Sequence, residues 1–280
     1  MDGYWVTRKW RAGPCGETIK FWVPGRKPVR MTQQARRDIR KAAQNAASGV
    51  KMAARIVNAS FCEGDALLTL DYDTPHHDAM TRDLLPGMDA EDREMAIWYM
   101  ARKNLQNTIR RARRAAAKDG VTMQYMCFTS DRDDKDGELV PCRVHHHIIA
   151  GAKTAEYILA AWRDGGTNTR RLSAQPDYTP VVAYLFRQVR HVEDAKKYIA
   201  SRGLVRPEPE DRIARTGGPI RPPKGAVLLD QGEYKPGEPQ YIRYVLPDAM
   251  EDAETDESKG VVQVKTVKGH RKRRGPDEQA

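Results

Sequence analysis

The stretch from Arg143 to Ala150, which reads Arg-Val-His-His-His-Ile-Ile-Ala, constrains the fold of this 280-residue chain more than any other. Val144 and the pair Ile148-Ile149 flank the histidines, so the segment is predicted to be a buried strand. Successive side chains of a strand point to opposite faces of its sheet. His145 and His147 should therefore share one face, and His146 should lie on the other. Two neighbouring imidazoles on a rigid strand provide part of a metal site.

The segments around this strand predict an α+β fold, in which helices cover one face of an antiparallel sheet. Strands are expected at 66–70, 121–129, 143–150 and 168–175, and helices at 32–58, 90–118, 154–162 and 179–200. Residues 131–138 are predicted to be a polar turn, so that the strands on either side of it form a hairpin.

Composition divides the chain into four expected regions. These are an N-terminal extension with its helix (1–60), a central domain (61–210), a Pro/Gly-rich extension (211–246) and a disordered charged tail (247–280). The tail is acidic at first and ends in a basic run, His270-Arg271-Lys272-Arg273-Arg274, a composition that buries too little apolar surface to fold.

Charge and cysteine content limit the partners and the compartment. The net charge is +10 and the pI is about 9.4, which favours a polyanionic partner. The four cysteines have neither disulfide-framework nor zinc-finger spacing, so free thiols in a reducing cytoplasm are expected. No segment has the apolar length of a membrane span, and the N-terminus has no secretory pattern. A cytoplasmic protein with no membrane partner is therefore predicted.

The predicted helix 90–118 is strongly basic. Asp89 is a suitable N-cap, yet no acidic residue occurs from Met95 through Lys118. Such a face is often merely solvated, but this charge favours contact with nucleic-acid phosphates. The residues proposed for that contact are Arg110, Arg111, Arg113 and Arg114.

A metal held by two histidines needs a third ligand. The strand before the histidines offers Asp131, and the returning arm offers Glu138, although both are also ordinary turn residues. Two imidazoles, a carboxylate and water suit Mn²⁺ and related ions, and Mg²⁺ less well. Asp131 is the predicted ligand, completing a divalent-metal site with His145 and His147.

Tyr184 lies on the predicted helix after the histidine strand, with Arg187 on the same helical face. A tyrosine hydroxyl, with an ordinary pKa of ~10, needs a polarised phosphate or a nearby cation to act as a nucleophile. A tyrosine on an amphipathic helix more often only packs. Its position after a His-x-His strand favours a catalytic role, with Arg187 neutralising the phosphate.

Several blocks in this order resemble the HUH-type, single-tyrosine rolling-circle replication initiators of bacterial phages and plasmids. The blocks are 58–72, His145-His146-His147, Trp162 with Gly165-Gly166, Tyr184-Leu185-Phe186-Arg187, and 201–209. The chain has Arg187 where the family usually has lysine, and arginine cannot readily release its proton. It has Thr129-Ser130-Asp131 where the family usually offers a glutamate, so Asp131 is expected to substitute.

The resemblance implies an RRM/ferredoxin-like core and a metal-dependent DNA nickase. Tyr184 would attack single-stranded DNA at a replication origin, leaving a 5′-phosphotyrosine bond and a free 3′-OH. Host helicase and polymerase would be its further partners. Conjugative relaxases and single-tyrosine transposases use the same chemistry. An inactive DNA- or RNA-binding protein on the same sheet is the alternative from another class.

Overall fold

The computed structural model describes residues 3–24, 39–82, 84, 86–190, 192, 195–214 and 216–247, with only the backbone for 39–48. Residues 32–38 of the expected first helix and 248–280 of the expected tail lie outside the described residues. The protein is α+β, with two antiparallel sheets of five strands each.

The histidines lie in the central sheet, whose strand order is β6-β3-β5-β4-β7. Its strands are β3 (Ala66–Asp71), β4 (Tyr125–Lys135), β5 (Glu138–Ala150), β6 (Thr167–Arg171) and β7 (Ile199–Ala200). The expected turn at 131–138 is wrong, because β4 and β5 pair as far as Lys135 and Glu138. Asp136 and Gly137 alone make the turn, with φ of 53° and 92°, the left-handed pair that a tight two-residue hairpin requires.

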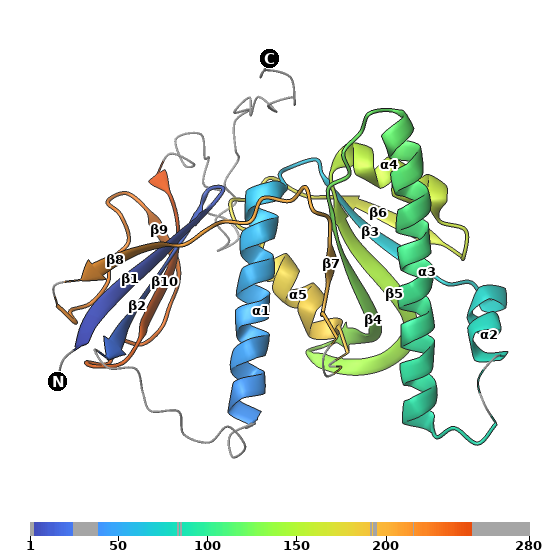
Figure 1. The fold of residues 1–280 in the computed structure, drawn as a ribbon, viewed down its shortest axis with the longest axis horizontal. Coiled ribbons are helices and arrows are strands. Elements are labelled where there is room, and N and C mark those ends of the chain that lie inside the picture. Colours follow the sequence, from blue (N-terminus) through green and yellow to red (C-terminus); the bar gives the residue numbers. More distant parts are fainter. Residues whose placement is uncertain are drawn as a thin grey trace.

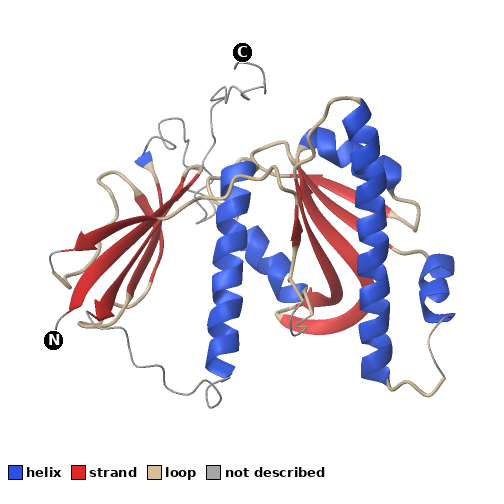
Figure 2. Ribbon diagram, viewed as in Figure 1, coloured by secondary structure: helices blue, strands red, loops and turns tan. Residues whose placement is uncertain are grey.

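Helices cover both faces of this sheet, so the prediction of one covered face is wrong. The helices α1 (Ile39–Ser60) and α5 (Thr179–Gln188) pack on one face, and α3 (Ala90–Lys118) and α4 (Ala152–Ala161) on the other (Figures 1 and 2). Consecutive residues of β5, Ile148 and Ile149, are both 0% exposed. A strand that is apolar on both sides has to be covered on both sides.

Helix ends follow local side-chain chemistry. Asp89 caps α3 as predicted, accepting a 2.8 Å hydrogen bond from the backbone N–H of Asp92. The helix expected at 179–200 is shorter, because Val189 after Gln188 is already extended. The short helix α2 (Thr74–Arg82) follows β3, and the Asp73 carboxylate accepts from the N–H of His76 in its first turn.

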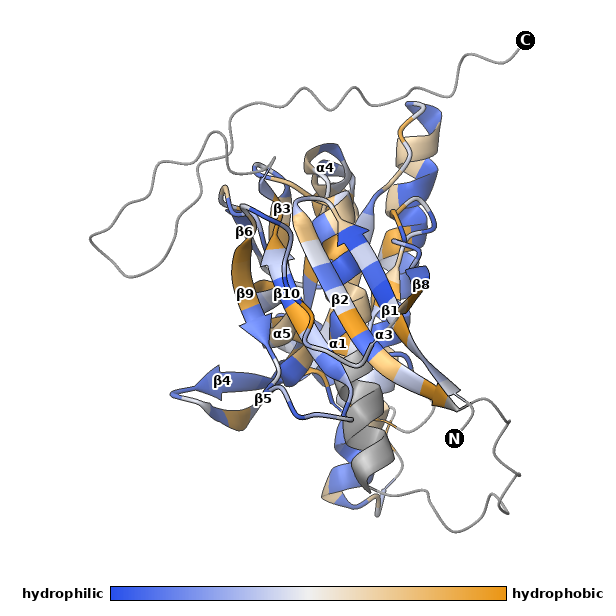
Figure 3. Cartoon of the chain, turned by 90° about the vertical axis from the view of Figure 1, so that its left-hand side faces the viewer, coloured by the Kyte–Doolittle hydropathy of each residue, from blue (hydrophilic) through white to orange (hydrophobic). Residues whose placement is uncertain are grey.

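The two ends of the described chain build the second sheet, of order β8-β1-β2-β10-β9. Its strands are β1 (Gly3–Ala12), β2 (Cys15–Pro24), β8 (Glu210–Ala214), β9 (Val227–Gln231) and β10 (Gln240–Val245). Hydrophilic and hydrophobic residues both occur along β1 and β2 (Figure 3). The N-terminal and the Pro/Gly-rich extensions, separate in the sequence, are thus a single structural unit.

Helix α1 stands between the two sheets (Figure 1). Its Arg55 donates to the buried Glu17 carboxylate of β2 at 2.6 and 2.7 Å and lies 3.6 Å from the ring centroid of Trp10. Arg243 of β10 pairs with Asp177, just before α5. In the part of the chain that the structure describes, no helix has the length and apolarity needed to cross a membrane.

Candidate metal and nucleophile site

The side chains of His145 and His147 converge as strand alternation predicts. Their Nε2 atoms lie 3.0 Å apart, and the rings meet edge to face. Two nitrogens bound about 2.1 Å from one ion at a right angle would lie about 3.0 Å apart. The spacing of the pair therefore fits two adjacent ligands of an octahedral ion.

The other ring nitrogens fix the orientation of both imidazoles. Nδ1 of His145 lies 3.0 Å from the carbonyl oxygen of Arg143, to which it can only donate. Nδ1 of His147 lies 3.1 Å from Oγ1 of Thr69 on the neighbouring strand β3. An Nδ1–H that donates to an oxygen leaves a lone pair on Nε2, which is the arrangement of metal-binding histidines. For His145 this tautomer follows from the carbonyl partner, and for His147 the Thr69 hydroxyl permits it.

Burial keeps His147 neutral. Burial, the largest cause, and the neighbouring His145 together lower the pKa of His147 to about 4, while Gln188 and Asp133 oppose the shift. Since a metal binds the neutral imidazole, His147 needs no deprotonation near neutral pH to act as a ligand.

Gln188, at the last position of α5, is the residue that the sequence did not indicate. Its amide lies near enough to His147 to raise the pKa of that imidazole, but neither Oε1 nor Nε2 makes a hydrogen bond to it or to any other described residue, and Gln188 is 0% exposed. An unpartnered buried amide costs about 1–3 kcal/mol, so such groups call for a partner. Among the described residues no three His, Cys, Asp or Glu side chains gather as a metal-binding group. The amide oxygen of Gln188 is a donor of another type that could serve as a third ligand.

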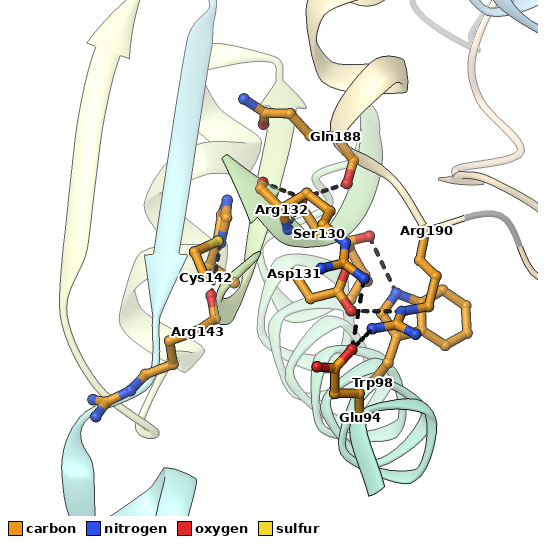
Figure 4. A network of polar contacts seen from close by, with 11 residues as sticks. Glu94, Trp98, Ser130, Asp131, Arg132, Cys142, Arg143, Gln188 and Arg190 are labelled. Atoms are coloured by element: carbon orange, nitrogen blue, oxygen red, sulfur yellow. Dashed lines mark hydrogen bonds and ion pairs between the residues drawn. The ribbon is translucent and has the colours of Figure 1, made fainter. Parts of the chain in front are cut away.

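Asp131, the predicted ligand, lies elsewhere. The register between β4 and β5 shifts between Ser130 and Arg132, and this bulge redirects the Asp131 side chain. Its Oδ2 accepts a 2.6 Å hydrogen bond from Nε of Arg190, on the side of Glu94 and α3 (Figure 4). The expectation that Asp131 completes the histidine site is therefore not supported by the geometry.

The alternative carboxylate, Glu138, is also remote. It pairs with Lys135 at the tip of the β4–β5 hairpin, seven residues from His145, or about 23 Å along an extended strand. Asp133 is the carboxylate that acts on His147, raising its pKa by charge. It is placed to influence the site, but the structure gives it no direct contact with either imidazole.

Tyr184 is the exposed tyrosine of α5, with 46% of its surface accessible. It precedes Gln188 by four residues, so the two side chains share one helix face one turn apart. Tyr178 and Tyr198 lie near Tyr184 in the sequence and are the rival candidates for the nucleophile, but both are less accessible. The hydroxyl of Tyr178 donates to the Ser173 carbonyl, and Tyr198 is half-buried against Phe128. Burial raises the pKa of both rival phenols, which disfavours them as nucleophiles.

Arg187 contacts the β4–β5 hairpin. Its Nη1 lies 3.2 Å from the Asp134 carboxylate, and its Nη2 donates to the carbonyl of Gly137. Its side chain is 45% exposed, so it can exchange this contact for a phosphate. In the structure, however, Arg187 is paired.

The four arginines of α3 differ in their surroundings. Arg111 donates to the Ala161 carbonyl and to Thr108, and Arg113 donates to the Tyr125 hydroxyl at 2.8 Å. Arg110 bonds Asn107 of its own helix, and Arg114 is exposed. All four belong to the helix on the sheet face opposite His145 and His147.

The Trp–Gly segment closes the sheet near the histidines. Trp162 ends α4 and packs edge to face on Tyr72 and His146. Gly165, with φ of 156°, runs so close to β3 that a Cβ there would lie 2.2 Å from the Asp71 carbonyl oxygen. Glycine is therefore required at this position.

Comparison with known proteins adds no relative. The chain matches no protein-family model, no curated protein and no solved structure.

Proposed function

We propose that this protein is a metal-dependent DNA nickase that starts rolling-circle replication through Tyr184. The observation that carries the proposal is the placement of an exposed tyrosine one helical turn from Gln188, whose unpartnered amide acts on one of two converging imidazoles. The order of motifs resembling the HUH-type initiators supports the same conclusion.

His145, His147 and Gln188 would hold the ion through Nε2, Nε2 and Oε1. Mn²⁺ and Mg²⁺ both fit an octahedral site, and the imidazoles favour Mn²⁺. When bound, the ion would supply Lewis-acid polarisation of a phosphodiester. Neutral His147, the tautomer of His145 that the Arg143 carbonyl fixes, and the same tautomer of His147 that Thr69 permits prepare the protein side of the site.

Tyr184 would form the covalent bond. Its phenolic oxygen attacks phosphorus, the bond from phosphorus to the 3′ oxygen breaks, and the phenolic proton is lost to solvent as the 3′ oxygen takes one up. The products are a 5′-phosphotyrosine and a free 3′-OH. Arg187 would leave Asp134 to pair with the phosphate, as a charge and not as a base. In a bacterial cytoplasm, the free 3′-OH would prime synthesis by a host polymerase, and a host helicase would be a further partner.

The test is formation of a covalent adduct. Wild-type protein with Mn²⁺ and a cognate single-stranded oligonucleotide should give a slow-migrating protein–DNA species on a denaturing gel. Tyr184→Phe should abolish the species and leave DNA binding nearly intact, because only the nucleophilic oxygen is removed. Tyr198→Phe is the matched control and should still form it.

Adducts that persist in Tyr184→Phe and disappear in Tyr198→Phe would move the nucleophile to Tyr198. DNA binding with no adduct under any metal would favour the non-enzymatic alternative, a DNA- or RNA-binding protein on this sheet. Cleavage that EDTA does not stop would remove the metal from the mechanism.

A further inference from the structure

A partly buried polar network joins β4, α3 and the segment that follows α5 (Figure 4). Arg190, two residues after α5, donates from Nε to Oδ2 of Asp131 at 2.6 Å and pairs through Nη2 with Glu94 of α3. The side chains of Arg190 and Asp131 are each 10% exposed. Arg132 lies 3.6 Å from Glu94 and completes the network.

Ser130 makes a second attachment to the C-terminal end of α5. Its Oγ lies 2.6 Å from the backbone carbonyl oxygen of Gln188, the shorter of its two carbonyl contacts, and 2.8 Å from that of Arg132, and Ser130 is 0% exposed. The last carbonyls of a helix have no partner within the helix. The hydroxyl of Ser130 therefore holds the backbone of Gln188 against β4, while the Gln188 side chain extends the other way (Figure 4).

Stability alone does not account for the ion pair. Taking two charges out of water costs about as much free energy as their attraction returns, so a buried pair adds little net stability. What such a pair can provide is a fixed arrangement. Here it fixes the chain immediately after Gln188, and Ser130 fixes Gln188 itself.

We infer that Ser130 and the Asp131–Arg190 pair are positioning residues that keep the Gln188 amide directed at His147. Asp131 thus acts on the metal site through Arg190 and not as a ligand. The inference rests on the proposed metal site. Groups that orient metal ligands typically change metal affinity 10–100-fold when removed.

The experiment is a titration of the full-length protein with Mn²⁺, in which free Mn²⁺ is followed by its electron paramagnetic resonance signal. Ser130→Ala and Arg190→Gln should each weaken Mn²⁺ binding about 10-fold. The matched control is Arg55→Gln, which breaks the Arg55–Glu17 pair of similar burial, 10% and 7% exposed, at the junction with the second sheet. Its Mn²⁺ affinity should not change, even where its melting temperature falls.

A merely structural role would lower the melting temperature of Arg190→Gln and Arg55→Gln and leave Mn²⁺ affinity unchanged in both, which would overturn the inference. Ser130→Ala removes a single oxygen and keeps the test valid if Arg190→Gln does not fold. In one outcome the wild type binds Mn²⁺ and His147→Ala abolishes this binding, while Ser130→Ala and Arg190→Gln both retain it in full. That outcome would refute the positioning role alone. A wild-type protein that binds no Mn²⁺ would refute the proposed metal site together with it.

A double-mutant cycle separates positioning from ligation. Because Ser130 and Arg190 act through Gln188, adding Ser130→Ala or Arg190→Gln to Gln188→Ala should cause little further loss of affinity. Asp131→Asn should behave in the same way. If instead Asp131→Asn and Gln188→Ala lose affinity additively, Asp131 is an independent ligand and the inference is wrong.

Discussion

At the scale of the residue, three consecutive histidines occupy two chemically different environments. His146 is fully buried on the α3 face, and burial lowers its pKa to about 3. Its Nε2 lies 3.0 Å from the Tyr72 hydroxyl, which itself donates to the Ala101 carbonyl, so Nε2–H of His146 is the donor. Its Nδ1 then accepts from Thr129 at 3.1 Å. Both nitrogens of His146 are used within the core, whereas each neighbour keeps one Nε2 for a ligand.

We expect His146→Ala to lower the free energy of unfolding by about 2–4 kcal/mol, since it leaves a cavity and removes the partners of two buried hydroxyls. Its Mn²⁺ affinity, measured below the unfolding transition, should stay at the wild-type value. His145→Ala and His147→Ala should abolish Mn²⁺ binding. Both should lower the free energy of unfolding, measured by urea denaturation, by less than His146→Ala does. Similar decreases of metal affinity in all three variants would contradict the two-face assignment of the strand.

At the scale of the element, α3 serves mainly to cover the sheet. Its buried stripe includes Trp98, Leu105 and Ile109, as the helical period predicts. Two of its four proposed DNA-binding arginines make structural contacts, Arg111 with the end of α4 and Arg113 with Tyr125. Arg110 and Arg114 remain as the members whose side chains are best placed to reach phosphates.

Arg110→Gln and Arg114→Gln should therefore reduce the salt dependence of single-strand binding, by about 0.7 in log–log slope for each phosphate that is no longer neutralised. Fluorescence anisotropy of a labelled oligonucleotide at several salt concentrations measures this slope. Arg111→Gln should instead lower stability by about 1 kcal/mol, because the Ala161 carbonyl is left without its donor. An unchanged slope in the Arg110/Arg114 double variant would show that this face is only solvated.

At the scale of the whole molecule, the second sheet is joined to the histidine sheet through α1. The buried Arg55–Glu17 pair and the Arg243–Asp177 pair connect strands of the second sheet to α1 and to the start of α5. The sulfhydryl of Cys15 adds a contact to the Pro176 carbonyl at 3.0 Å. Ion pairs therefore hold much of this junction together. Each charge in these pairs would be left without its counter-charge if its partner were removed.

Arg55→Met should destabilise the protein by about 3 kcal/mol, because it leaves the Glu17 carboxylate buried without a partner. The double variant Arg55→Met with Glu17→Leu should recover much of that stability, since both charges are then gone. Urea unfolding of the two single variants and the double variant measures the coupling. A double variant as unstable as the sum of the single ones would show that the two charges do not interact.

The features that the sequence predicts correctly are those that depend on near neighbours along the chain. Strand alternation placed His145 and His147 on one face, the helical period located α3, and Asp89 marked its first turn. These features follow from periods of 2 and 3.6 residues and from hydrogen bonds that span three residues. The placement of Tyr184 on a helix after the histidine strand belongs to the same class, whereas its exposure is known only from the structure.

The features that the sequence does not predict depend on residues that are far apart in the chain and meet only in the folded protein. Gln188 has no distinguishing pattern in the sequence and comes near His147 only through the packing of α5, and a bulge one residue beyond Ser130 directs Asp131 to Arg190 and not to the ligand position predicted for it. The second sheet forms because β1 and β2 pair with strands some 200 residues later, which local patterns cannot indicate. The consecutive apolar residues of β5 require cover on both sheet faces, but which helices provide it is decided only by packing.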